Sequence, residues 1–240
     1  VLEIGPGLGV LTQRLLEKKA SLIAVEKDRS FCEILKKELP ESKPGWTLLC
    51  QDILDLDLKR YFPDQKVKVI GNLPYYITAP ILFHLLEYRS SISRAVLMMQ
   101  KEVAARLVAS PGGKEYGRLS VAIQYSANVR KAFDVSRSCF TPAPEVDSTV
   151  VVLDVVDRKG DPEIETFFYE LVRLGFQQRR KTLLNLLAQA KPEGRSRAEI
   201  LQAFKQLGLA DDIRAERLSL DDFLALAALL LRKDCHPRMS

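Results

Sequence analysis

The chain has 240 residues, which is enough for one large domain or two smaller ones. Its content of 47% hydrophobic and 28% charged residues is that of a globular protein, and its longest apolar run, Leu224 to Leu231, is far too short to span a membrane. A formal net charge of +5 permits a polyanionic partner without demanding one.

The start of the chain and its cysteines bear on processing and redox state. The chain begins on Val1 without a Met and shows no signal peptide, so we expect that a segment precedes it. Its cysteines lie far apart and form no Cys-x-x-Cys pair: Cys32, Cys50, Cys139 and Cys235. We therefore expect neither a disulfide framework nor a metal site, and a reducing cytoplasm fits this pattern. His84 and His236 have no plausible metal ligand nearby, and we expect a structural or surface role for both.

The chain opens with a predicted strand, a glycine-rich turn and a helix. Val1 to Ile4 predicts a short buried strand, and the turn that follows, with Gly5 and Gly7, leads into helical periodicity. The glycines let the backbone approach a ligand, and the helix N-terminus offers free N–H groups. A second strand over 21–25 ends on Glu26, where a carboxylate can accept hydrogen bonds from both ribose hydroxyls of a nucleoside. This combination indicates a nucleotide-like ligand, with a purely structural turn as the alternative.

Asp52 follows the third predicted strand, over 46–50, after a helix over 31–39 that Pro40 ends. It therefore lies at the carboxyl end of a strand, where ligands bind in open α/β sheets. A carboxylate there can accept a hydrogen bond from the adenine amine of S-adenosylmethionine, which favours this cofactor. A helix cap is the alternative role.

The tetrapeptide Asn72-Leu73-Pro74-Tyr75 follows the fourth predicted strand, over 67–71. It suits an exocyclic amine such as adenine N6, a poor nucleophile whose lone pair is delocalised into the ring. The Asn72 side-chain carbonyl and a backbone carbonyl beside Pro74 can accept the two N–H bonds and free that lone pair. Pro74 fixes φ without adding an N–H, and the Tyr75 ring can stack on an extruded base without needing its hydroxyl. The alternative is a strand-ending turn with a buried tyrosine.

The remaining elements complete a sheet and then change in character. After the tetrapeptide, helices and strands are predicted over 80–88, 94–99, 100–109, 119–127, 129–135 and 149–156. Phe140, in the stiff loop 140–144, can form the second wall of an aromatic sandwich around a flipped base.

After a polar linker at 157–162, only helical periodicity follows, at 163–175, 180–190, 196–207 and 221–232. Asp161 and Ser196 are candidate caps for two of these helices. We therefore predict an α/β, Rossmann-like domain over residues 1–157 and a smaller all-helical domain over residues 158–240.

Basic residues in both predicted domains are candidates for contact with a nucleic acid. They are Lys101, Arg106, Arg118, Arg179, Arg180 and Lys181. For the run 178–181, a solvated helix face is the alternative.

With these motifs assembled, the sequence resembles the small-subunit ribosomal RNA adenine dimethyltransferases of KsgA type over nearly its entire length. The resemblance is carried by nine blocks: 3–9, 25–26, 51–52, 71–75, 100–104, 116–120, 140–148, 176–183 and 214–219. It implies a Rossmann-like S-adenosylmethionine-dependent methyltransferase domain followed by a helical domain. It also implies transfer of two methyl groups to N6 of each of two adjacent adenines near the 3′ end of small-subunit RNA. The expected partner is an immature small ribosomal subunit, with the enzyme a cytoplasmic monomer.

The resemblance also implies roles for single residues. Gly5, Glu26, Asp52 and Asn72 contact the cofactor or line its pocket. The amine site is formed by Asn72, Leu73 and Tyr75, with Phe140 as the opposite stacking face. The family carries an N-terminal Gln-Asn-Phe-Leu segment that closes over the cofactor, and this chain begins after it.

Three alternatives are kept. The first is a large-subunit RNA adenine methyltransferase of the antibiotic-resistance type, against which the second-domain blocks argue. The second is a non-catalytic ribosome-assembly factor, against which the complete amine site argues. A nicotinamide dehydrogenase is the weakest, because nothing resembles an acid/base pair for its substrate.

Overall fold

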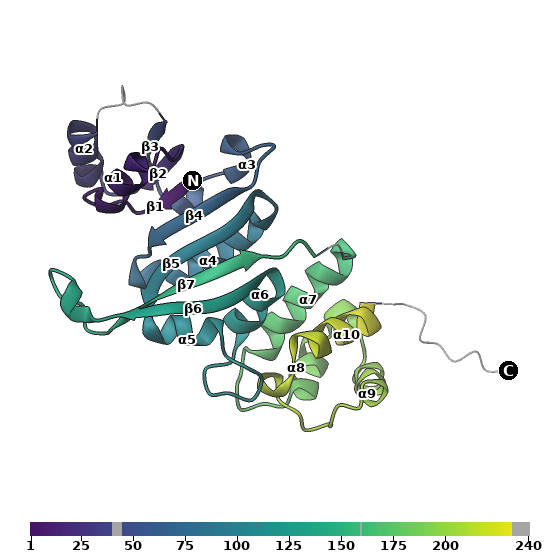
Figure 1. Ribbon diagram of the computed structural model, residues 1–240. Helices are drawn as coiled ribbons and strands as arrows, with labels where there is room; N and C mark the ends of the chain where they lie inside the picture. The colour runs from purple at the N-terminus through teal and green to yellow at the C-terminus, as the bar shows by residue number, and fades with distance from the viewer. Residues whose placement is uncertain (40–44, 159, 232–240) are drawn as a thin grey trace. The chain divides into compact units, whose positions relative to one another are not determined.

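The computed structural model describes residues 1–39, 45–158 and 160–231 (Figure 1). The predictions for Pro40, Cys235 and His236 lie outside these residues. By their packing, these residues form two compact units, the first of Val1–Val108 with Ser126–Asp157, and the second of Ala109–Tyr125 with the described residues after Asp157. The domain boundary after residue 157 stays a prediction. The segment 109–125, however, was predicted in the first domain and packs in the second unit.

The first unit is built on a mixed sheet with the strand order β3-β2-β1-β4-β5-β7-β6 (Figure 1). The strands are β1 (Leu2–Ile4), β2 (Leu22–Glu26), β3 (Trp46–Cys50), β4 (Val67–Asn72), β5 (Ile92–Gln100), β6 (Ala127–Val135) and β7 (Ser148–Val155). β1 to β5 pair in parallel, whereas β7 pairs antiparallel with both β5 and β6. Each predicted strand is present, and the Rossmann-like α/β prediction is confirmed.

The helices of the first unit connect these strands, and α4 and α5 lie behind the sheet in the view of Figure 1. They are α1 (Val10–Glu17), α2 (Arg29–Glu38), α3 (Leu58–Tyr61), α4 (Thr78–Glu87) and α5 (Lys101–Leu107). The short α3 has no apolar periodicity long enough to predict it from sequence. β1 is tied to α1 through Glu3, whose buried carboxylate accepts a 2.8 Å hydrogen bond from Thr12 and whose pKa is raised by burial.

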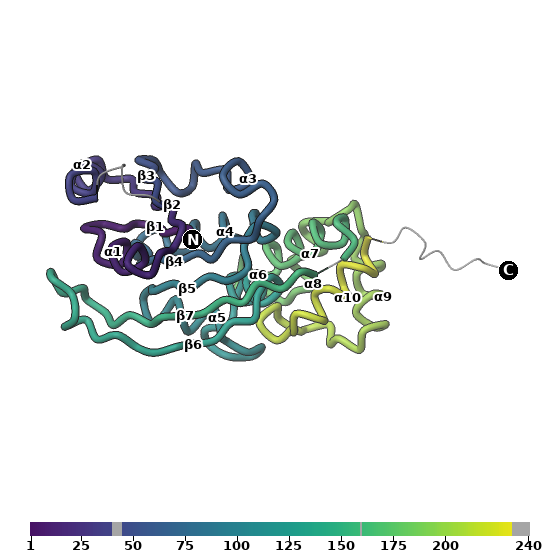
Figure 2. The backbone as a smooth tube through the Cα atoms, turned by 45° about the horizontal axis from the view of Figure 1, so that its top comes forward, coloured from purple at the N-terminus to yellow at the C-terminus, as the bar shows by residue number. Residues whose placement is uncertain are grey.

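β6 and β7 form a long hairpin that extends past the neighbouring strands (Figure 2). Its end is held by local hydrogen bonds, since the Arg137 N–H donates to Asp147 Oδ1 at 3.0 Å and its guanidinium donates to the Glu145 carbonyl at 3.2 Å. Further from the end of the hairpin, Asp134 in β6 accepts a 2.6 Å hydrogen bond from the Thr149 hydroxyl in β7. The predicted loop with Phe140 is therefore part of a folded arm.

The second unit is helical in its described part, as predicted. Its helices are α6 (Arg118–Ser126, which runs into the first unit), α7 (Pro162–Gly175), α8 (Leu183–Ala190), α9 (Arg197–Gln206) and α10 (Leu220–Leu231). Phe168, Phe204 and Phe223 are fully buried in its core. Asp161 and Ser196 cap α7 and α9 as predicted, and Ser196 forms a capping box with Glu199.

The expectation of no disulfide is wrong. Cys32 in α2 and Cys50 at the end of β3 lie 6.1 Å apart between Cα atoms and form a disulfide. They are 18 positions apart in sequence and become neighbours only because α2 packs beside β3. Cys139 is an exposed thiol.

His84 has a structural role, because its Nε2 pairs with the Leu56 carbonyl at 3.1 Å and its ring packs edge-on against Tyr88.

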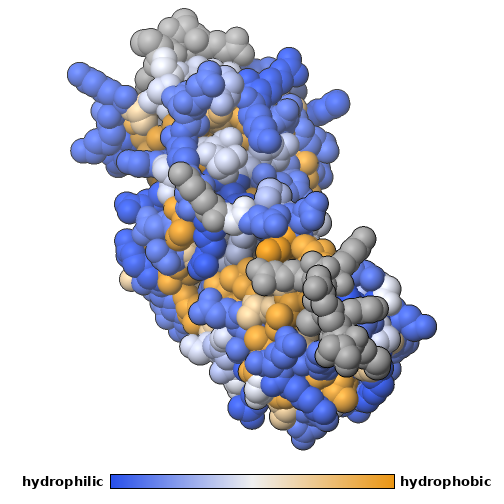
Figure 3. Space-filling model, turned by 90° about the vertical axis from the view of Figure 1, so that its right-hand side faces the viewer, coloured by the Kyte–Doolittle hydropathy of each residue, from blue (hydrophilic) through white to orange (hydrophobic). Residues whose placement is uncertain are grey.

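Over the described residues, hydrophobic side chains fill the cores of both units. Figure 3 shows one face, where hydrophilic residues cover most of the surface and hydrophobic residues are visible in patches between them. No helix in the described ranges combines the length and the apolar character needed to cross a membrane.

Candidate active site

The carboxyl ends of β1, β2, β3 and β4 meet at one edge of the sheet, because these strands are parallel. The glycine turn after β1 occupies this edge, and Gly5, Gly7 and Gly9 all adopt positive φ, which favours glycine. A Cβ on Gly5 would lie 3.8 Å from the backbone oxygen of Asn72, so the turn directly adjoins the tetrapeptide after β4. One residue earlier on each strand, at Ile4 and Gly71, the backbones also lie close together, since a Cβ on Gly71 would lie only 2.8 Å from the Ile4 carbonyl oxygen.

A pocket of about 390 Å³ opens at this edge. It is lined by Ile4, Gly5, Val25, Glu26, Lys27, Asp28, Phe31, Asp52, Ile53, Pro74, Tyr76, Ile77 and Ile81. The structure thus brings together three predicted cofactor residues, Gly5, Glu26 and Asp52, with Pro74 of the tetrapeptide. Gly7, Asn72, Tyr75 and Phe140 are not among the lining residues.

Glu26 is buried at the end of β2 and is held by two backbone groups. Its Oε2 accepts a 3.1 Å hydrogen bond from the Gly7 N–H, and its Oε1 accepts one of 2.8 Å from the Asp28 N–H. A carboxylate has about four lone-pair sites, so acceptor capacity remains for a further ligand. Gly7 therefore acts on the pocket through Glu26, by fixing the orientation of its carboxylate.

Asp52 both caps a short 3-10 turn and pairs with a lysine. Its Oδ1 accepts a 3.0 Å hydrogen bond from the Leu54 N–H, and its Oδ2 lies 2.7 Å from Lys27 Nζ. The Lys27 ammonium, followed by the Leu54 N–H, lowers the pKa of the Asp52 carboxyl. The helix-cap role is thus present together with a position in the pocket, so the two interpretations of Asp52 do not exclude each other.

The tetrapeptide presents two acceptors beside the pocket. Asn72 ends β4 with an exposed side chain, whereas Leu73 is buried and its N–H donates to the Met98 carbonyl at 2.9 Å. Within the described residues, neither the Asn72 side chain nor the Leu73 carbonyl has a hydrogen-bond partner. The Pro74 carbonyl, by contrast, accepts from the Ile77 N–H and from the Thr78 hydroxyl. The second predicted acceptor is therefore best identified as the Leu73 carbonyl.

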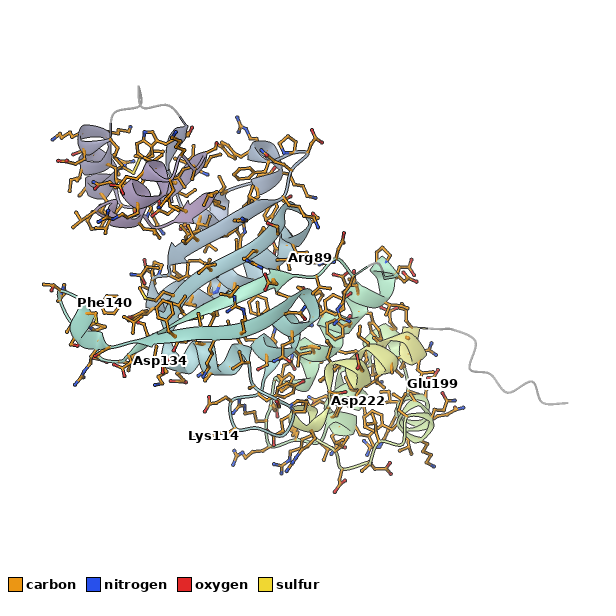
Figure 4. All side chains as sticks on the ribbon, viewed as in Figure 1. Arg89, Lys114, Asp134, Phe140, Glu199 and Asp222 are labelled. Atoms are coloured by element: carbon orange, nitrogen blue, oxygen red, sulfur yellow. A yellow bond between two sulfur atoms is a disulfide. The ribbon has the colours of Figure 1, made fainter. Side chains whose placement is uncertain are left out.

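The two predicted stacking residues lie in different elements of the first unit. Tyr75 begins a short 3-10 turn, and its hydroxyl forms a 2.7 Å hydrogen bond with Ser148 Oγ. Phe140 lies near the end of the β6–β7 hairpin and is half-buried (Figure 4).

Sequence reasoning missed two aromatic residues of the pocket. Phe31 in α2 is 36% exposed, and Tyr76, directly after the tetrapeptide, is 80% exposed. The position of Tyr76 was a usable signal, since it directly follows the tetrapeptide at the end of a parallel strand, where ligands bind in open α/β sheets. Phe31 carries no such signal, because only the packing of α2 brings it to the pocket.

The predicted RNA contacts are partly engaged within the protein. Lys101 pairs with Asp134 at 2.7 Å, and Arg106 pairs with Glu102 one helical turn away. Arg179 donates to the carbonyls of Lys114 and Tyr116, at 3.5 and 3.4 Å. The run 178–181 lies in the turn between α7 and α8, so the alternative of a solvated helix face is wrong.

Comparison with known proteins gives concordant matches. The family model described as ribosomal RNA adenine dimethylase matches residues 1–231. "Ribosomal RNA small subunit methyltransferase A" of Desulfitobacterium hafniense is 44% identical over 232 residues, which cover 97% of this chain and 82% of that protein. The protein of the same name from Lactococcus lactis is 44% identical over 239 residues, with 96% and 80% covered.

Two solved structures are similar over nearly the whole chain. A dimethyladenosine transferase from Plasmodium falciparum matches with a TM-score of 0.75 and 28% identity, covering 94% of this chain and 87% of that one. The 23S rRNA methyltransferase ErmE matches with a TM-score of 0.68 and 24% identity, covering 95% and 89%, which is a likeness of fold.

Proposed function

We infer the function from one premise, which is that the chain belongs to the ribosomal RNA adenine dimethylase family. It is a methyltransferase that dimethylates adenine in ribosomal RNA. We propose that it transfers two methyl groups to N6 of each of two adjacent adenines near the 3′ end of small-subunit RNA. We propose further that it acts in the cytoplasm, as a monomer, on an immature small ribosomal subunit.

The pocket at the ends of β1 to β4 supports S-adenosylmethionine as the methyl donor. Glu26 has acceptor capacity left for the ribose diol, and Asp52 for the adenine amine. Ile53 and Phe31 add apolar surface for the adenine ring. When bound, the cofactor supplies an electrophilic methyl group on a sulfonium. Gly5 allows the backbone to approach that ligand, since no Cβ projects from the turn.

The amine site prepares the adenine N6 for attack. The Asn72 side-chain oxygen and the Leu73 carbonyl each accept one N–H of the amine, which draws the nitrogen toward tetrahedral geometry and frees its lone pair. Positioning by these acceptors does most of the catalysis, and Tyr75 and Phe140 hold the extruded base by stacking. The methylated nitrogen is acidic and releases its proton to solvent, so no general base is required. In the second transfer only one N–H remains, so only one acceptor can engage it.

Small-subunit RNA is proposed as the substrate because of the family match and because the relatives are named as methyltransferases of small-subunit ribosomal RNA. The relatives of 44% identity are named for the small subunit, which disfavours a large-subunit methyltransferase. Methyl transfer is best supported by the two acceptors at Asn72 and Leu73, which have no partner within the described residues and lie beside a pocket. A non-catalytic assembly factor would not need such acceptors.

Incubation of immature small subunits with labelled S-adenosylmethionine tests this function. Methylation of two neighbouring adenines near the 3′ end of the RNA, found by mapping the modified bases, is the expected result. Label on large-subunit RNA only would favour the antibiotic-resistance class instead. Cofactor binding by calorimetry without label on any RNA would favour an assembly factor.

A further inference from the structure

We propose that Ser148 is a positioning residue for methyl transfer, because its hydroxyl fixes the position of the Tyr75 ring against the target base. The inference rests on the proposed function, in which Tyr75 is a stacking face. It reverses the expectation from sequence that the Tyr75 hydroxyl is dispensable.

Ser148 offers a fixed anchor point. It is fully buried as the first residue of β7, and it is paired with Gln100 of β5 on one side and Val135 of β6 on the other. The strand ladders therefore hold its backbone from both sides. Its Oγ lies 2.7 Å from the Tyr75 hydroxyl, a full-strength hydrogen-bond distance between two hydroxyls.

Tyr75 is held at its other end by the backbone of the tetrapeptide. The Pro74 carbonyl accepts from the Ile77 N–H at 3.2 Å and from the Thr78 hydroxyl at 3.0 Å, which locks the turn in which Tyr75 lies. With the backbone fixed, two side-chain torsions decide where the ring points. The hydrogen bond to Ser148 restrains the first torsion, because the Tyr75 hydroxyl lies on the axis of the second torsion and is displaced only when the first one changes. The position of the ring is therefore set before a base arrives.

Ser148 also joins Tyr75 to the loop that carries Phe140. The loop is closed at its base by Asp147, whose Oδ1 accepts from the Arg137 N–H and whose carbonyl accepts from the Lys101 N–H at 3.0 Å. Ser148 is the next residue along the chain. One hydroxyl pair thus connects the two predicted walls of the base site, although 73 positions separate Tyr75 from Ser148.

Single-turnover methylation of immature small subunits by Ser148→Ala, Tyr75→Phe and the double variant tests the proposal. Loss of one hydrogen bond that orients the ring should lower the transfer rate about tenfold in each single variant. The double variant should be no slower than either single one, because both changes remove the same contact. Affinity for S-adenosylmethionine should stay unchanged, and Ser148→Thr, which keeps the hydroxyl, should recover most of the rate.

Ser93→Ala is the matched control, since it removes another strand serine, whose hydroxyl donates to the Val67 carbonyl away from the pocket. A wild-type rate in Ser148→Ala with an intact fold, or rate losses that multiply in the double variant, would overturn the proposal. If Ser148→Ala does not fold, Tyr75→Phe decides alone, because it leaves the buried serine in place.

Fluorine NMR of the free protein, labelled with 3-fluorotyrosine, separates this proposal from the proposed function. The Tyr75 resonance, identified by its loss in Tyr75→Phe, should shift in Ser148→Ala and stay in place in Ser93→Ala. An unmoved resonance refutes the anchoring whatever the activity. A wild-type protein that methylates no RNA refutes the proposed function, while the fluorine spectra still decide whether Ser148 holds the ring.

Discussion

At the scale of single residues, Asn72 and Glu26, for which different roles are proposed, also differ in their surroundings. Asn72 is exposed at the end of its strand with no partner among the described residues, as an acceptor that awaits a ligand requires. Glu26 is buried and already holds two backbone N–H groups. A change at Asn72 should therefore affect chemistry alone, whereas a change at Glu26 affects both the ligand and the turn that receives it.

Asn72→Ala should lower the rate of methyl transfer by about a hundredfold or more, because one acceptor of the developing charge is lost. The unfolding midpoint and the affinity for S-adenosylmethionine should change little, since the side chain is exposed and lies outside the pocket lining. Single-turnover assays on immature small subunits measure the effect. Asn128→Ala, which removes an exposed asparagine in β6, is the control, and equal rates for both variants would refute the amine-holding role.

Glu26→Ala should weaken binding of S-adenosylmethionine by about 1–3 kcal/mol, the scale for lost hydrogen bonds to a charged group. Isothermal titration calorimetry checks this. Glu33→Ala, on the exposed surface of α2, makes the same change in charge and should bind normally. Glu26→Gln should fall between the wild type and Glu26→Ala, because one acceptor oxygen remains. An unchanged dissociation constant in folded Glu26→Ala would remove Glu26 from the ribose site.

At the scale of elements, the caps of the helical unit are set by local sequence. Ser196 accepts from the Glu199 N–H, and Glu199 Oε2 accepts from the Ser196 N–H and hydroxyl, at 2.8 and 2.7 Å. These bonds from Ser196, followed by the Arg195 guanidinium, lower the pKa of Glu199 to about 2. A lowered carboxyl pKa contributes stability above the ordinary value of 4.5, and this contribution is lost as pH falls toward 2.

Ser196→Ala should lower the free energy of unfolding by about 1 kcal/mol at pH 7, because the cap of α9 is lost. The difference from the wild type should shrink between pH 4.5 and about 2, where Glu199 becomes protonated in the wild type as well. Urea denaturation at a series of pH values measures it. Ser196→Thr keeps the hydroxyl and should behave as the wild type, and a difference that does not depend on pH would contradict the link to Glu199.

At the scale of the whole molecule, basic residues of both units are proposed to contact RNA. Arg179 has a second role in the fold, because its guanidinium donates to the carbonyls of Lys114 and Tyr116 in the segment 109–125. Lys114 is labelled in Figure 4. A change at Arg179 therefore alters the fold and RNA binding together. Arg180 and Lys181, exposed in the same turn, give the cleaner test.

The double change Arg180→Gln with Lys181→Gln should weaken RNA binding at low salt and reduce the slope of log affinity against log salt by about two, about one for each lost phosphate contact. Filter binding to small-subunit RNA over a range of salt concentrations gives the slope. Lys36→Gln with Lys37→Gln, on the exposed surface of α2, makes the same change in net charge and should leave the slope unchanged. Equal slopes for both double variants would show that the turn does not touch RNA.

The local features were determined by the sequence alone, because each depends on residues a few positions apart. The hydrophobic pattern of residues 46–50 is enough to predict β3 over Trp46–Cys50. The caps at Asp161 and Ser196 follow from the capping preferences of these residue types. The acidic residues at strand ends follow from the pattern of ligand sites in parallel sheets. The tetrapeptide's position at the end of β4 follows in the same way. Its proposed role as an amine site was argued from its residue types, with a structural turn as the alternative, and is implied by the family resemblance.

The tertiary structure alone decided the contacts between residues distant in sequence. The Cys32–Cys50 disulfide, the Lys27–Asp52 pair and the bond from Tyr75 to Ser148 join residues 18, 25 and 73 positions apart. Segment 109–125 joined the helical unit for the same reason, since Tyr116 is buried in its core and donates to the Leu218 carbonyl. No periodicity or cap encodes such pairs, because they form only when the strand order and the packing of the helices place the two side chains together.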